Sequence, residues 1–308
     1  MHFAQELQPT SFLDSAVIST VRNSCRLNPT ELRSRRDAGA SATVKLPLCE
    51  SILDDMRVRL WDGKGWSGTD MVSRMTYLAC LWAFDQASRI SEYTLPEPGA
   101  VDHCIRVDDL TFYRQTSGGV VCRSGSDLAK DLNSSTEGSR SPKQVIECRA
   151  QGASSKGKAI VKSKLVGRRS LEEAQFLEDL VLFLMRSNSK GTDELFSYRE
   201  GPGKKKALRG RTVRNEIKTA CAMRGLPPTY FSSHSLRKGS ITHMRASGAT
   251  EDDRRDRGNY APGSQVMNQT YDYATGLGPL AANSLPGGYK PTVVDVHRLI
   301  PAARNHSL

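Results

Sequence analysis

The chain has 308 residues, of which 38% are hydrophobic, so it is long enough for one large domain or two ordinary ones with a buried core. Lysine and arginine total 44 against 33 acidic residues, and the formal net charge of +11 favours polyanionic partners such as nucleic acid or an anionic membrane surface. The cysteines are scattered singly, which argues against a disulfide framework and a structural zinc site. Without a long apolar run or a signal-peptide layout, a nuclear or cytoplasmic protein that is not secreted is expected.

The N-terminal part, 1–44, ends in a basic and polar run that is typical of a linker, ELRSRRDAGASAT. We expect a short helical N-terminal remnant there, followed by a domain over 45–275. At the start of this domain, 46–61 and 70–92 have apolar residues at roughly helical spacing and predict two helices that share one core.

Short runs rich in β-branched residues follow at 103–113, 144–149 and 159–162, and they predict a small antiparallel sheet. Between the first two runs, 123–143 is rich in serine and glycine, which is typical of a mobile insertion without a chemical role.

Three further helices are predicted at 170–185, 212–224 and 234–246, each from apolar spacing together with start or stop signals. The glycines and prolines of 276–308 predict an irregular C-terminal tail. The expected fold class is therefore α+β, mostly helical with a small antiparallel sheet.

Candidate ligand-binding residues stand at the start of the predicted helix 234–246, in the stretch SSHSLRKGS. His234 and Arg237 are three residues apart, so they share one helix face and can converge on an anion. Arg89 lies at the C-terminal end of the otherwise apolar predicted helix 70–92, where a single arginine is most simply explained by snorkelling or by a salt bridge.

Four fragments together resemble the catalytic domain of the tyrosine recombinases, the phage integrase family. They are ASRISE at 87–92, DELFSYR at 193–199, HSLRKG at 234–239 and RGNYAPGSQVMNQTYDY at 257–273, and their order is that of the family. The resemblance implies a DNA strand transferase that cleaves and rejoins strands through a 3′-phosphotyrosine without metal or cofactor. A mobile element is the implied source.

The resemblance also assigns roles. Arg89 and Arg237 would stabilise the charge that develops on the attacked phosphate, since guanidinium groups donate fork-shaped hydrogen bonds to such oxygens. His234 would share the proton of the nucleophile and help to hold the phosphate. Tyr271 is the preferred nucleophile, with Tyr273 as the alternative.

The leaving 5′ oxygen needs a proton, which the family takes from a lysine on a turn of its small sheet. Lys156 is the candidate here and Lys158 the reserve. The chain departs from the family at Gly258-Asn259-Tyr260, where a histidine or tryptophan is usual after the glycine. Asn259 or Tyr260 would replace that residue, by donating a hydrogen bond or by packing under the phosphate.

Two alternatives remain beside the recombinase. A catalytically impaired DNA-binding remnant would keep the basic surface and the phosphate-binding arginines but lose strand transfer. A type IB topoisomerase-like enzyme would use the same residue types to relax DNA. For the recombinase, the resemblance implies double-stranded DNA as the partner and a homotetramer on DNA, with a monomer expected in solution and no membrane partner.

Overall fold

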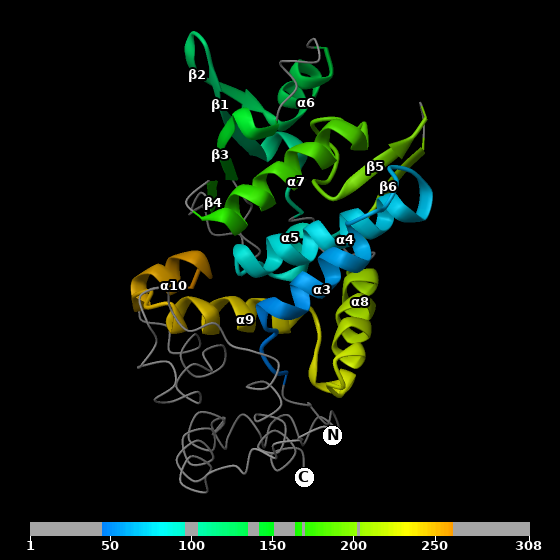
Figure 1. Cartoon of the computed structure of the whole chain (residues 1–308), viewed down its shortest axis with the longest axis vertical. Helices are drawn as coiled ribbons and strands as arrows, with labels where there is room; N and C mark the ends of the chain where they lie inside the picture. Colours follow the sequence, from blue (N-terminus) through cyan, green and yellow to red (C-terminus); the bar gives the residue numbers. More distant parts are fainter. Residues whose placement is uncertain are drawn as a thin grey trace, which may run out of the picture.

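The computed structural model of the chain describes residues 45–95, 104–134, 142–150, 164–167, 170–201 and 204–260. Its described part mixes helices with small antiparallel sheets, which confirms the α+β class (Figure 1). The predicted N-terminal remnant, the predicted strand 159–162 and the C-terminal tail lie outside the described residues. No helix of the described part is long and apolar enough to cross a membrane.

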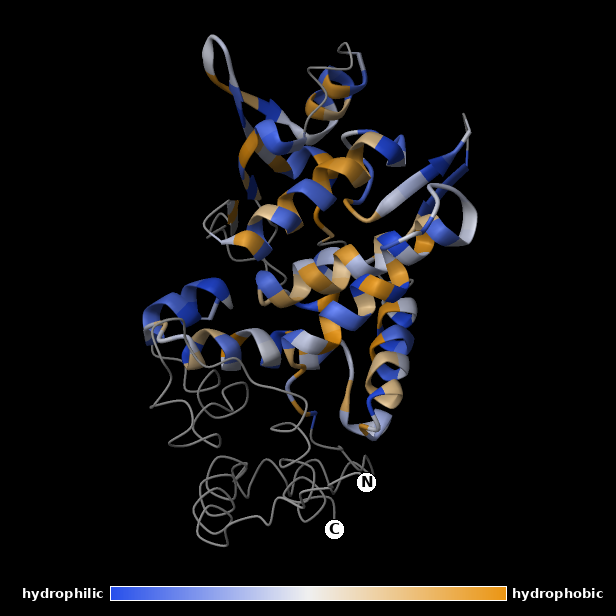
Figure 2. Ribbon diagram, in the orientation of Figure 1, coloured by the Kyte–Doolittle hydropathy of each residue, from blue (hydrophilic) through white to orange (hydrophobic). Residues whose placement is uncertain are grey.

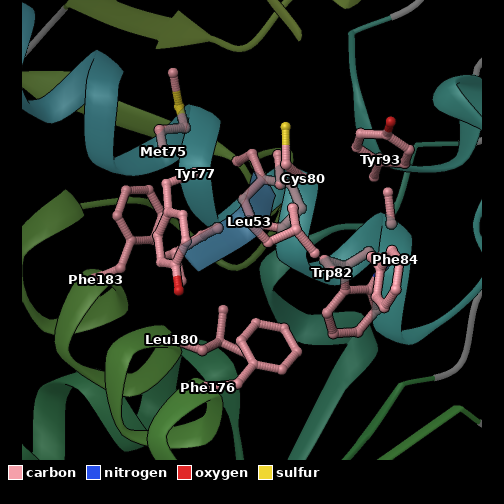
Figure 3. Close-up of a cluster of buried hydrophobic side chains, with 14 of the residues drawn as sticks. Leu53, Met75, Tyr77, Cys80, Trp82, Phe84, Tyr93, Phe176, Leu180 and Phe183 are labelled. Atoms are coloured by element: carbon pink, nitrogen blue, oxygen red, sulfur yellow. The ribbon is translucent and has the colours of Figure 1, made fainter. Parts of the chain in front are cut away.

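Helix α4 (Gly68–Asp85) lies at the centre of the main hydrophobic core and packs against α3 (Glu50–Leu60), α7 (Leu171–Ser187), α8 (Gly210–Met223) and α9 (Ser233–Ala246). Apolar residues recur along α4 at every turn, so this helix can bury side chains on several of its faces. The Trp82 ring packs edge-on against Phe176 (Figure 3), with ring centroids 6.3 Å apart, and also against Phe196, with ring centroids 6.4 Å apart. Buried side chains from both ends of the described sequence thus share one core.

A four-stranded antiparallel sheet has the order β2-β1-β3-β4. Its strands are β1 (Leu110–Thr116), β2 (Gly119–Ser124), β3 (Val145–Ala150) and β4 (Lys164–Gly167). Phe112 of β1 pairs with Cys148 of β3, and both side chains are fully buried beneath the helices. A second sheet is a hairpin of β5 (Ser197–Glu200) and β6 (Lys204–Ala207), which the sequence analysis did not predict.

Helix α6 (Gly125–Ser134) corrects the expectation of a mobile insertion at 123–143. It packs against α7 because Leu128 and Leu132, four residues apart on one helix face, are both fully buried. Two leucines among small and polar residues form too short an apolar stripe to be recognised in the sequence.

The predicted helix 70–92 is wrong at its C-terminal end. Helix α4 stops at Asp85, and a separate short helix, α5 (Ile90–Tyr93), follows. The predicted helices 170–185, 212–224 and 234–246 are confirmed as α7, α8 and α9, with ends that differ by one or two residues. Beyond α9 lies the predominantly hydrophilic α10 (Glu251–Arg257) (Figure 2).

Candidate functional site

The N-terminus of α9 is capped from within the SSHSLRKGS stretch. The Ser232 hydroxyl accepts from the backbone N–H of His234 at 3.3 Å, and Ser235 Oγ accepts from the N–H of Ser232 at 3.1 Å. These bonds satisfy donors that a helix start leaves without intrahelical partners, so the serines begin the helix at this point. His234 and Arg237 then lie one turn apart, as the spacing predicted.

Lys238, the third basic residue of this stretch, is bound within the protein. Lys238 is 5% exposed, and its Nζ donates to the backbone carbonyl of Lys45 at 2.6 Å. This lysine therefore ties the start of the described chain to α9, which is a structural role. His234 is half-buried in the first turn of the helix.

Arg237 is the most constrained member of the site, because its side chain is almost completely buried, with 1% of the residue exposed. Its Nε donates to Tyr260 Oη at 3.0 Å, Nη1 donates to the Ala87 carbonyl, and Nη2 donates to the Gly258 carbonyl. The three acceptors come from two segments of the chain, Ala87 from the turn after α4 and Gly258 and Tyr260 from the turn after α10. Arg237 therefore joins α9 to the ends of α4 and α10.

Both of these helix ends are left-handed turns of the Schellman type. After α4, Ala87 has φ 47°, its N–H donates to Phe84, and the next N–H donates from Ser88 to Ala83. After α10, Asn259 has φ 50°, and the N–H of Tyr260 donates to the carbonyl of Arg255 at 3.0 Å. Arg237 binds one carbonyl in each turn and so holds the two turns together.

Arg89 follows the first of these turns, two residues after Ala87, and caps α5 rather than ending α4. Its Nη1 donates to Glu92 Oε1 at 3.1 Å, while its backbone N–H donates to Glu92 Oε2, also at 3.1 Å. The side chain is 30% exposed. The simple prediction of a salt-bridged arginine is thus confirmed for this residue, but the arginine also lies in the segment that Arg237 contacts.

Tyr260 covers the guanidinium of Arg237. Its ring centroid lies 4.4 Å from the Cζ of Arg237, a distance at which a cation and an aromatic face attract each other. The ring also packs with Ala87 and Ile241 in a small apolar cluster. The prediction that Tyr260 donates a hydrogen bond or packs under a phosphate stays a prediction, and the contacts that the structure gives the ring and hydroxyl of Tyr260 here are with Arg237.

A row of cations extends from this region along β6 and α8. Four exposed residues on these elements have side chains that form no hydrogen bond or ion pair within the described ranges: Lys204, Arg209, Arg211 and Lys218. Gly210, between Arg209 and Arg211, packs against α5, because the Cδ1 atom of Ile90 would lie 3.1 Å from a Cβ added at Gly210. We call these four residues the α8 basic row.

Two described tyrosines are poorly suited to act as the nucleophile. Burial raises the pKa of Tyr93 well above its ordinary value and that of Tyr77 to about 12, so both hydroxyls resist ionisation in the core. The predicted nucleophiles Tyr271 and Tyr273, and the predicted proton donors Lys156 and Lys158, lie outside the described residues.

The described ranges contain no group of three or more His, Cys, Asp or Glu residues that could hold a metal ion. Burial raises the pKa values of the thiols of Cys49 and Cys221, which favours their protonated form.

No family model matches the chain, and no curated protein matches it.

Sequence reasoning missed the contacts that assemble the site. The bond from Arg237 to Ala87 spans 150 positions, and the left-handed position of each turn is occupied by Ala87 or Asn259 instead of the glycine that usually marks such a helix end. The α8 basic row could have been found from the run KKK at 204–206 followed by arginines at the start of a predicted helix.

Proposed function

We propose that the chain is a DNA strand transferase of the tyrosine recombinase type, which forms a 3′-phosphotyrosine and then rejoins the strand. The observation that carries the proposal is the hydrogen bond from Arg237 to Ala87, because it brings the segments of the two candidate phosphate-binding arginines together. The α8 basic row adds exposed positive charge on β6 and α8, and Gly210 of α8 packs against Ile90, the residue after Arg89; exposed charge of this sign suits a polyanionic partner.

In the proposed reaction, the oxygen of Tyr271 attacks the phosphorus and forms the P–O bond of the phosphotyrosine while the bond to the 5′ oxygen breaks. Lys156 supplies the proton to that leaving oxygen, and His234 takes up the proton of the tyrosine. Arg89 and Arg237 stabilise the charge on the non-bridging oxygens. Double-stranded DNA is the proposed partner, with a tetramer formed on DNA by a protein that is monomeric in solution.

A DNA-binding remnant without strand transfer is the second candidate, and the burial of Arg237 favours it. A guanidinium with 1% of its residue exposed, whose three nitrogens all donate to protein acceptors, meets a phosphate only after the surrounding contacts open. Under the recombinase proposal, that opening is a step that follows DNA binding.

The test is incubation of the protein, without divalent metal, with nicked suicide duplexes taken from the flanks of its coding element. A protein–DNA adduct that resists denaturation, and that Tyr271→Phe abolishes while Tyr273→Phe does not, supports the proposal and its nucleophile. The opposite pattern identifies Tyr273. DNA binding without any adduct favours the remnant, and relaxation of supercoiled DNA without strand exchange favours the topoisomerase-like alternative.

A further inference from the structure

The guanidinium of Arg237 is held from three directions. Tyr260 Oη accepts from Nε, and the carbonyls of Ala87 and Gly258 accept from Nη1 and Nη2. Because a guanidinium is planar and its N–H bonds have fixed directions, three acceptors at its three nitrogens define both the position and the orientation of the plane. The Tyr260 ring lies over the group and restricts motion out of the plane.

The turn before Tyr260 is shaped to place this ring. Asn259 adopts a left-handed conformation with φ 50°, which asparagine tolerates better than most residues. Gly258 leaves the space that the ring fills, since a Cβ at this position would lie 2.2 Å from Cε2 of Tyr260. In this turn Gly258 leaves room for the ring, Asn259 reverses the chain, and Tyr260 supplies the ring and its hydroxyl.

From this geometry we infer that Tyr260 is a positioning residue: its bond to Nε and its ring keep the guanidinium of Arg237 oriented while Nη1 and Nη2 exchange the Ala87 and Gly258 carbonyls for the DNA phosphate, which Tyr260 does not itself bind. The inference rests on the proposed function and deepens it. It explains why Tyr260 can stand near the position where the resembled family has histidine or tryptophan. The Tyr260 side chain acts through Arg237 instead of contacting DNA.

The competing arrangement is a direct contact. A phenol that accepts a hydrogen bond from Nε still carries its own O–H, and this proton could be donated to a phosphate oxygen. The two arrangements differ in one measurable respect. If Tyr260 positions Arg237, the effect of Tyr260→Phe on adduct formation disappears once Arg237 is replaced. If Tyr260 binds the phosphate directly, the effect of Tyr260→Phe stays the same.

The first experiment uses the free protein and needs no DNA. The ¹⁵Nε–H signal of Arg237 is identified by its loss in Arg237→Lys and is then followed in Tyr260→Phe, which keeps the ring and removes the hydroxyl. We expect a shifted signal whose exchange with water is about tenfold faster, since a hydrogen bond to a charged group is lost. An unchanged signal overturns the inference.

The matched control is Tyr198→Phe. Tyr198 is another buried tyrosine, but its hydroxyl donates to the carbonyl of Gly68 at 3.2 Å, at the opposite end of α4 from Ala87. Its replacement also removes a buried hydroxyl and should leave the Arg237 signal unchanged. Circular dichroism and thermal unfolding of all variants establish that they are folded.

The second experiment measures single-turnover adduct formation in a double-mutant cycle of Tyr260→Phe and Arg237→Lys. A substrate with sulfur in place of the bridging 5′ oxygen keeps the slow variants measurable, because a thiolate leaves without a proton. We expect Tyr260→Phe to lower the rate constant of adduct formation about tenfold in the protein that retains Arg237, and less than about twofold in the Arg237→Lys variant.

Two results of the cycle overturn the inference. An equal loss in both backgrounds shows that Tyr260 contacts the DNA directly, and a rate that rises in Tyr260→Phe shows that the tyrosine obstructs Arg237. If the wild type binds DNA and forms no adduct, the proposed function fails. In that case the Nε signal of the free protein still decides whether Tyr260 orients Arg237.

Discussion

Gly239 of α9 lies directly against the carbonyl oxygen of Leu48. A Cβ added at Gly239 would come within 2.1 Å of this oxygen and within 2.8 Å of the Phe84 ring. The backbone N–H of Leu48 also donates to the carbonyl of Ser235 at 2.9 Å, so α9 and the chain before α3 touch backbone to backbone. This close approach fixes the helix that carries His234 and Arg237 relative to the core.

Replacing Gly239 by alanine should therefore destabilise the protein by about 3 kcal/mol, because the obstacle is backbone and cannot rotate away. Urea unfolding followed by tryptophan fluorescence measures the change. Gly118→Ala is the control, since nothing lies within 4 Å of the added Cβ and no positive φ is required there. Equal stability of the two variants would contradict the tight α9 contact.

The ion pair of Asp193 and Arg199 predicts a dependence of stability on pH. Burial alone raises the pKa of Asp193, but hydrogen bonds from Arg199 and from the N–H of Lys190 outweigh burial, and the pKa lies below its ordinary value. Lys205 Nζ also faces this carboxylate at 3.9 Å. A lowered pKa in the folded state stabilises the protein above the unfolded pKa of about 4, and this contribution is lost as the pH falls through the folded pKa.

Asp193→Asn should destabilise the protein by about 1–2 kcal/mol at neutral pH, because the buried Asp193 side chain loses its charge-assisted bonds from the partly exposed Arg199. It should also flatten the decline of the free energy of unfolding below about pH 4. Asp252→Asn, which changes a carboxylate whose side chain is 86% exposed, should change stability by less than about 0.5 kcal/mol. A wild-type acid profile retained in Asp193→Asn would contradict the assignment.

The α8 basic row predicts how DNA affinity depends on salt. Replacing Arg211 or Lys218 by glutamine should weaken binding to a duplex and reduce the slope of log affinity against log salt by about 1 each, because each phosphate contact releases counterions. Fluorescence anisotropy over a salt series measures the slope. Lys130→Gln on α6, a lysine whose side chain is 76% exposed, is the matched control and should leave the slope unchanged.

Gly258→Ala should separate the Tyr260 ring from Arg237, since the added Cβ would occupy the place of the ring. We expect a loss of stability of about 1–3 kcal/mol and an adduct rate at least about tenfold lower. Thermal unfolding and the suicide-duplex assay measure the two effects. A variant that forms adduct at the wild-type rate would show that the ring position is unimportant.

The long helices were predictable because each buries a continuous apolar stripe. In α7, Phe176, Leu180 and Leu184 recur every four residues, and Ser170 caps the start by accepting from the N–H of Glu173. The hairpin of β5 and β6 was not predictable in this way, because β6 consists mostly of half-exposed or exposed lysines. Its pairing with β5 depends on backbone hydrogen bonds, which leave no pattern in the sequence.

In the candidate site, too, local spacing was predictable from the sequence, whereas contacts between distant segments were not. The spacing of His234 and Arg237 was readable because three residues form almost one helical turn. The end of α4 at Asp85 was not readable, because the chain reverses at an alanine whose carbonyl is held by a residue 150 positions away. The burial of Arg237 likewise depends on Tyr260, which lies against Arg237 because α10 packs against α9.

The lysine contacts at the start of the described chain have a mechanical consequence. Lys238 Nζ binds the carbonyl of Lys45, and Lys45 Nζ binds the carbonyl of Thr229, each at 2.6 Å. Leu46 is also tied to Tyr230 by a backbone bond of 2.9 Å. A force that pulls on the chain at residue 45 therefore loads α9 and the connection before it first, so tension applied there reaches the helix of Arg237 before it reaches the sheet.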